Sequence, residues 1–134
     1  MSHSRAIANV KHVLAVLDDD SDVRDSLKFW LGIEGFEVRT YASPTELLND
    51  DGLHAFSCVI VDYHLPRMNG LEVIAKLRER RSSAPAILMT AHSDDGIRQR
   101  ASAAGAVLVE KPLEGTVLIE WILTLLETNS KRSS

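Results

Sequence analysis

Residues 58–70 read Cys58-Val59-Ile60-Val61-Asp62-Tyr63-His64-Leu65-Pro66-Arg67-Met68-Asn69-Gly70. An unbroken apolar run ends in one carboxylate, and a loop containing a proline and a glycine follows it. Such a run is typical of a strand that is buried on both faces, as in a parallel sheet covered by helices. The stretch therefore predicts a central strand with Asp62 at its carboxyl end, where a turn begins.

Runs of the same character recur along the chain, with amphipathic segments between them. The expected strands are residues 13–17, 37–41, 58–61, 86–90 and 106–109. The spacing of apolar residues predicts helices over residues 23–34, from Ser43 onward, and over 70–81, 94–104 and 113–127, with Gly35 and Gly105 as terminators. This alternation predicts an α/β doubly wound fold, in which a five-stranded parallel sheet carries helices on both faces.

The last expected helix, residues 113–127, has more apolar residues than one stripe can hold. One face at helical spacing contains Leu118, Trp121, Ile122 and Leu125, whereas Ile119 and Leu123 fall to its side. Two readings stay open. The extra apolar surface either binds a partner or widens the side that faces the core.

Composition limits the chain to one soluble domain. It has 134 residues, a net charge of −4, 45% hydrophobic and 25% charged residues, enough to bury a core without disulfides or a structural metal. We expect the domain at 10–127, with tails at 1–9 and 128–134. A single cysteine, Cys58, and the lack of a signal or membrane-spanning stretch favour the cytoplasm. The acidic balance disfavours a nucleic-acid surface.

Carboxylates follow two of the expected strands. Asp18, Asp19 and Asp20 come directly after residues 13–17, and Asp62 ends the run at 58–61. Asp20 fits the solvated start of a helix, but Asp18 and Asp19 are better placed to meet Asp62 at the carboxyl edge of the sheet. Three carboxylates there predict a pocket for Mg²⁺, which is bound by few protein oxygens and several waters.

The two remaining strand ends carry a hydroxyl and an ammonium group. Residues 86–90 end in Thr90, followed by Ala91, and residues 106–109 are followed by Glu110, Lys111 and Pro112. Taken singly, Thr90 suits a strand and Lys111 suits the surface. Together at an acidic pocket they supply donors for phosphoryl oxygens.

This ordered set resembles the receiver domain of bacterial response regulators, the CheY-like family of two-component signalling. The resemblance covers residues 10–127, nearly the whole chain. Its marks are Asp18-Asp19, Asp62 with Pro66 and Gly70, Thr90-Ala91, and Lys111-Pro112. The pairs Val23-Arg24, Ser26-Leu27 and Gly35-Phe36, with Glu110-Lys111-Pro112, are most similar to receivers of FixJ or NtrC type. The family implies a flavodoxin-like sheet with strand order 2-1-3-4-5.

The resemblance also implies roles at the site. Asp62 would take a phosphoryl group from a sensor histidine kinase or a histidine phosphotransfer protein. Mg²⁺, or Mn²⁺, would be held by Asp19, Asp62 and the backbone carbonyl of His64, with Asp18 acting through water. Lys111 and Thr90 would bind phosphoryl oxygens, and the bond before Pro112 would be cis. The chain would catalyse its own phosphorylation and slow dephosphorylation without being a conventional enzyme.

In the family, movement of the threonine favours an active form of the surface built from the fourth helix, fifth strand and fifth helix. That surface would bind a downstream target or a second copy of the chain. An aromatic residue usually assists this switch, but its position holds Leu108. His64, His92 and Ala91, beside Asp62 and Thr90, would modulate the reaction.

Two other functions compete with phosphoacceptance. A phosphorylation-independent docking or dimerisation module is favoured by Leu108 and by the apolar flank of residues 119 and 123. A hydrolase of the haloacid dehalogenase type is disfavoured, because it needs a second Asp where this chain has His64.

Overall fold

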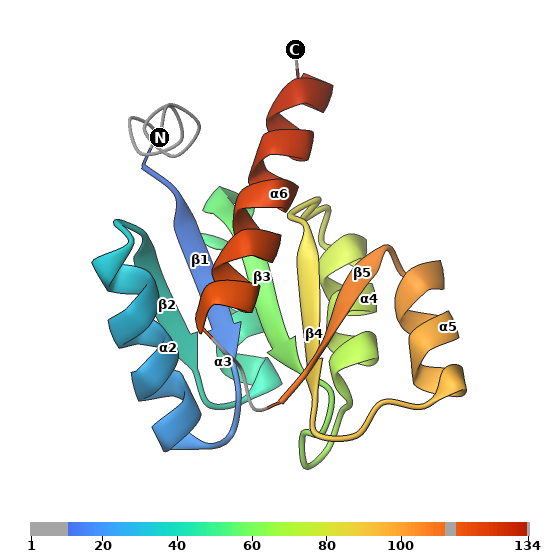
Figure 1. The fold of residues 1–134 in the computed structure, drawn as a ribbon. Coiled ribbons are helices and arrows are strands. Elements are labelled where there is room, and N and C mark those ends of the chain that lie inside the picture. The colour runs from blue at the N-terminus through green and yellow to red at the C-terminus, as the bar shows by residue number, and fades with distance from the viewer. Residues whose placement is uncertain (1–10, 112–114, 134) are drawn as a thin grey trace.

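The computed structural model describes residues 11–111 and 115–133. Five parallel strands form one sheet in the order β2-β1-β3-β4-β5 (Figure 1), as the resemblance implied. The elements are β1 (Val13–Leu17), α2 (Ser21–Ile33), β2 (Glu37–Tyr41), α3 (Pro44–Leu48), the 3₁₀ turn η1 (Leu53–Ala55), β3 (Phe56–Asp62), α4 (Gly70–Glu79), β4 (Ala86–Thr90), α5 (Asp95–Ala103), β5 (Ala106–Glu110) and α6 (Gly115–Ser133).

Helices cover both faces of the sheet, and each face has its own apolar cluster. α2 and α6 pack on one face, and α3, α4 and α5 pack on the other (Figure 1). Along β3, Cys58 and Ile60 join the first cluster, whereas Val59 and Val61 join the second. Every side chain from residue 58 to 61 is therefore fully buried, which explains why this strand is an unbroken apolar run.

Local signals set where several helices begin. Ser43 caps α3 by accepting a hydrogen bond from the backbone N–H of Glu46, and Pro44 occupies the first helical position. Asn69 caps α4 through a capping box with Glu72, which brings the chain from β3 into the helix within a short loop. These caps hold the loops at the carboxyl edge of the sheet.

The last helix, α6, differs from the expectation in its length and in the face that it buries. α6 runs to Ser133 instead of ending at residue 127, so described residues beyond 127 are helical. On this helix Leu118, Ile122 and Leu126 are buried, whereas Trp121, expected on the core-facing stripe, is 40% exposed. Ile119 packs against the core instead, so the helix is rotated relative to the expected stripe.

Part of the chain's exposed surface is apolar. Phe29, Trp30 and Ile33 project from α2, and Val117 and Trp121 project from α6, each with at least 40% of its surface exposed. No helix among the described residues is long and apolar enough to cross a membrane.

Candidate functional site

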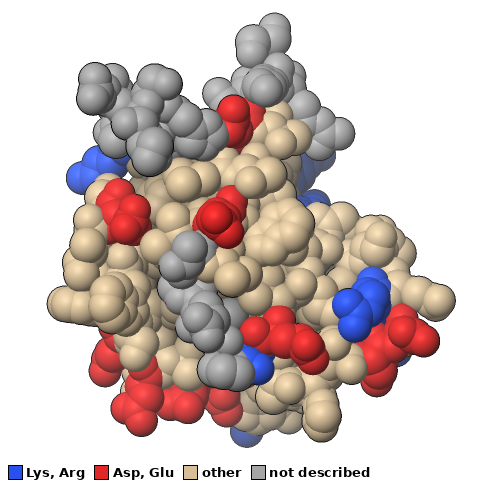
Figure 2. All heavy atoms as spheres, viewed as in Figure 1, with Lys and Arg blue, Asp and Glu red and all other residues tan. Residues whose placement is uncertain are grey.

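The carboxyl ends of β1 and β3 bring three acidic side chains together. Asp18 and Asp19 directly follow β1, and Asp62 is the last residue of β3. Their carboxylate oxygens lie within 4.8 Å of one another. Figure 2 shows acidic side chains gathered along the lower edge of the molecule, where the strands end in the same view. The three expected pocket residues therefore meet as a cluster.

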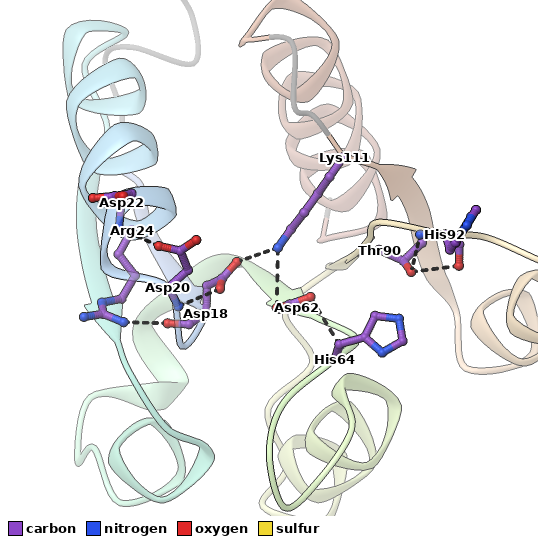
Figure 3. A network of polar contacts seen from close by, with 9 residues as sticks. All are labelled: Asp18, Asp20, Asp22, Arg24, Asp62, His64, Thr90, His92 and Lys111. Atoms are coloured by element: carbon purple, nitrogen blue, oxygen red, sulfur yellow. Dashed lines mark hydrogen bonds and ion pairs between the residues drawn. The ribbon is translucent and has the colours of Figure 1, made fainter.

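Asp18 is fully buried and held by several contacts (Figure 3). Its Oδ1 accepts a hydrogen bond from the backbone N–H of Asp20 at 2.9 Å, and its Oδ2 accepts one from Lys111 Nζ at 3.0 Å. The guanidinium of Arg24 donates to the backbone carbonyl of Asp18 at 2.8 Å. These contacts hold Asp18 in a fixed position in the pocket, whereas Asp19 is exposed.

Lys111 reaches from the end of β5 to both buried acids. Its Nζ lies 3.0 Å from Asp18 Oδ2 and 3.4 Å from Asp62 Oδ2. Burial alone would lower the pKa of this ammonium, but the hydrogen bond and charge of Asp18, followed by those of Asp62, outweigh it and raise the pKa. Its backbone N–H donates to the carbonyl of Thr90 at 2.8 Å, which fixes β5 against β4.

Asp62 is 5% exposed. Burial, followed by the charge of Asp18, raises the pKa of its carboxyl, while Lys111 and the backbone N–H of His64, 3.2 Å from Oδ1, oppose that rise. A buried carboxylate beside another acid is costly unless a cation offsets the charge. Lys111 supplies part of that charge, and the geometry favours a further cation.

Gly70, at the start of α4, packs directly on the backbone of Asp62. A Cβ added at Gly70 would lie 2.6 Å from the carbonyl oxygen of Asp62 and 2.6 Å from Leu88 Cδ1. Both contacts are shorter than real Cβ atoms tolerate, so only glycine fits. The N–H of Gly70 also donates to the carbonyl of Tyr63 at 3.0 Å. The sequence predicted Gly70 as the end of the loop, the start of a helix and a mark of the family, but it did not predict this contact.

Thr90 and its neighbours lie at the adjacent strand end. Thr90 is fully buried, and its hydroxyl donates to the backbone carbonyl of His92 at 3.0 Å and accepts from the N–H of His92 at 3.2 Å (Figure 3). Ala91 and the ring of His92 are exposed, and Leu108 is half-buried against the cluster under α4 and α5. The Thr90 hydroxyl is therefore engaged with a loop and not with Asp62.

The side chain of His64 is exposed, and its ring extends away from Asp62 in Figure 3. The ring meets the edge of Tyr63, with centroids 4.9 Å apart. The Tyr63 hydroxyl accepts a hydrogen bond from Arg100 of α5 at 3.1 Å, a contact that sequence reasoning missed. Pro112, and the cis bond expected before it, lie outside the described residues.

The donor set suits a hard divalent cation. Three carboxylates converge, two of them buried and one open to solvent. Oxygen ligands of this kind, with room left for water, are what Mg²⁺ prefers. His64, whose backbone N–H donates to Asp62 Oδ1, lies in the loop that follows β3.

Comparison with known proteins settles the family. Residues 14–123 match the family model described as the response regulator receiver domain. This chain belongs to the response regulator receiver family. It is a receiver domain of two-component signalling in sequence as well as in fold, as the motifs predicted.

Relatives in sequence include regulators of FixJ type. The transcriptional regulatory protein FixJ of Bradyrhizobium diazoefficiens is 33% identical over 120 residues, which are 87% of this chain and 58% of FixJ. The response regulator protein TmoT of Ectopseudomonas mendocina is 34% identical over 116 residues, covering 86% of this chain and 53% of TmoT. This receiver thus spans a little over half the length of these curated relatives.

Solved structures agree with the sequence relatives. The response regulator StyR superposes with a TM-score of 0.83 at 32% identity, covering 92% of this chain and 63% of StyR. The structure titled FixJ-N superposes with a TM-score of 0.77 at 31% identity, covering 88% of this chain and 95% of the other. The expected similarity to FixJ-type receivers is therefore confirmed.

Proposed function

We propose that this receiver accepts a phosphoryl group on Asp62 from the phosphohistidine of a sensor kinase or a histidine phosphotransfer protein. The observation that carries the proposal is the position of Asp62, which ends a fully buried strand between Asp18 and the ammonium of Lys111. Family membership supports the same assignment.

In this reaction an Oδ oxygen of Asp62 attacks phosphorus, and the bond between phosphorus and the imidazole nitrogen breaks. The imidazole keeps the bonding electrons and takes up a proton, and Asp62 becomes an acyl phosphate. Lys111 favours the ionised carboxylate that attacks, because its charge opposes the rise in the pKa of Asp62. The rigid hydrogen bonds of Asp18 keep Lys111 directed at the reacting group.

Asp19, Asp62 and the backbone carbonyl of His64 would hold Mg²⁺, or Mn²⁺, with Asp18 acting through water. When bound, the ion neutralises the acids and the phosphoryl oxygens. The arrangement of the three carboxylates supports this assignment, because among the described residues Lys111 is the one cation paired with the two buried acids.

Thr90 and Lys111 bind the phosphoryl oxygens once Asp62 is modified. Thr90 must first release the His92 backbone, to which its hydroxyl now donates. The hydrogen bonds between Thr90 and His92 hold the loop before α5. Their loss on phosphorylation therefore lets that loop change conformation. Ala91, His92 and His64 border the pocket and set how water reaches the acyl phosphate.

The output surface is built from α5, β5 and α6, the fourth helix, fifth strand and fifth helix of the receiver unit at residues 10–127. It contacts a downstream protein in the cytoplasm or a second copy of the chain. Leu108 lacks the ring of the usual aromatic switch, so this signal passes through the backbone of the loop at 91–94. A structure with beryllofluoride that leaves α5 and β5 unmoved would refute this route.

Intact mass spectrometry after incubation with Mg²⁺ and acetyl phosphate tests the function. Wild-type protein should gain one phosphoryl group, and Asp62→Asn should gain none. Absence of a gain in wild type would favour the phosphorylation-independent docking module, which Leu108 and the exposed Trp121 support.

A further inference from the structure

A second polar pocket lies at the end of the sheet opposite Asp62. It has a volume of about 480 Å³ and opens between the loop before β4, the turn between α5 and β5, and the carboxyl-terminal half of α6. Figure 1 shows the loop before β4 at the upper end of the sheet beside α6, far from the lower edge where the acids gather. The pocket is therefore separate from the phosphorylation site.

The charged side chains that line the pocket, among the described residues, are Arg78 and Arg81, and no carboxylate lines it. Arg78 donates to the backbone carbonyl of Ser82 at 3.0 Å, and neither arginine has a carboxylate partner within the described chain. Burial lowers the pKa of Arg78. In a chain with a net charge of −4, this concentration of positive charge favours an anion.

Ser82 adds a hydroxyl to the same wall. The residue is 3% exposed and lines the pocket. Its backbone N–H donates to Leu77 and its carbonyl accepts from Arg78, so the backbone of Ser82 is paired within the chain. No buried side-chain oxygen or nitrogen among the described residues lacks a hydrogen-bond partner, so the Ser82 hydroxyl is not an unsatisfied group. It offers a molecule in the pocket one donor.

Arg81 occupies a position that favours another residue type. Its φ is +65°, and it is the one described non-glycine residue with a positive φ. The helix end requires this conformation, because Ser82 donates back to the carbonyl of Leu77 and closes the last turn of α4. Glycine or asparagine would adopt it with less strain. The helix end thus explains the conformation but not the arginine, which places a guanidinium at the pocket.

From these contacts we infer that the pocket binds the phosphate monoester of a small organic molecule. Two guanidinium groups and the hydroxyls of Ser82 and Ser83 offer more donors than a carboxylate accepts, and they match the three terminal oxygens of a phosphate. Pro85 and Leu125 line the same cavity and give an apolar wall for the organic group. The volume suits a small-molecule ligand.

Titration of ¹⁵N-labelled protein with phenyl phosphate tests the proposal. The full chain is used as Asp62→Asn with EDTA, so that the acidic pocket neither reacts nor holds a metal ion. We expect saturable amide shifts at residues 81–84 and 104–106 and none at 18–20. Inorganic phosphate lacks the organic group and benzoate lacks the phosphate, so each should bind at least about tenfold more weakly than phenyl phosphate.

Matched variants separate binding from folding. Arg81→Gln and Ser82→Ala should each weaken binding by about tenfold, whereas Lys28→Gln, which removes an exposed charge on α2, should leave it unchanged. Arg81→Gly should lose binding with no fall in the thermal midpoint, since glycine suits φ of +65°. No saturable shift with phenyl phosphate, equal binding of inorganic phosphate or benzoate, or unaltered binding in Arg81→Gln would each overturn the inference. Failure here leaves phosphorylation of Asp62 untouched, because the titration does not use it.

Discussion

Replacing Lys111 with methionine should destabilise the metal-free protein by about 3 kcal/mol. The substitution keeps an unbranched side chain but removes the cation that lies 3.0 Å from Asp18 and 3.4 Å from Asp62. Both acids are buried, so each would be left without its nearest positive charge.

Two considerations give the magnitude. Breaking a buried ion pair by removing one partner costs about 3–5 kcal/mol, and the lower end applies because 24% of the Lys111 side chain is exposed. Independently, the substitution removes an attraction of about 5 kcal/mol to each acid at an effective dielectric constant of about 20, and the loss is offset in large part because the ammonium no longer has to be desolvated.

Urea unfolding of wild type and Lys111→Met, with EDTA and with Mg²⁺, measures this loss. Mg²⁺ should shrink the difference, because the ion replaces the missing charge. Lower pH should shrink it too, since the pKa of Asp62 is raised in the folded protein and the protonated group no longer repels Asp18. Lys28→Met on α2 is the control. A loss below about 1 kcal/mol without metal, or one that Mg²⁺ leaves unchanged, would refute the reasoning.

Three further predictions concern the supports of the site. Gly70→Ala should lower stability by about 1–3 kcal/mol and slow phosphorylation, because its Cβ would meet the carbonyl of Asp62. Gly32→Ala, which meets nothing within 4 Å, should be neutral or stabilising by urea unfolding; equal losses would contradict the clash. Asp20→Ala should cost about 1 kcal/mol, because Asp20 caps α2, yet keep phosphorylation in the acetyl phosphate assay; lost phosphorylation would place Asp20 in the site. In metal-free wild type, the raised pKa of Asp62 contributes stability that is present below the ordinary carboxyl pKa and is lost as pH rises through the raised value. The urea midpoint should therefore fall as the pH rises between about 4 and 7, and it should fall less in Asp62→Asn. The same pH dependence in both proteins would contradict the assignment.

The sheet was predictable because burial on both faces leaves a simple pattern. β3 is fully apolar from Cys58 to Val61, and its neighbours share that character. Its start was missed, because Ser57 interrupts the apolar run. In the structure the Ser57 hydroxyl pairs with His12 at 2.9 Å, so a polar residue fits within the strand. His12 lies 45 residues from Ser57 in the sequence, so no local sequence pattern predicts this contact.

The acidic cluster was also predictable, since parallel strands place their carboxyl ends at one edge. The contacts of its side chains were not. Lys111 bridging two acids, Thr90 bonded to His92 and Gly70 pressed on Asp62 depend on the relative placement of separate elements. The exposure of Trp121 was not predictable either. Helical spacing shows which residues share a face, but it does not show which face the helix turns toward the sheet.

The central claim is that Asp62 is the residue that receives the phosphoryl group. Peptide mapping by mass spectrometry, after incubation with Mg²⁺ and acetyl phosphate and trapping of the acyl phosphate with borohydride, locates the modified carboxyl directly. The account predicts modification at Asp62 alone, absent when EDTA replaces Mg²⁺. Modification at Asp18 or Asp19, or at any residue in Asp62→Asn to the wild-type extent, would contradict it.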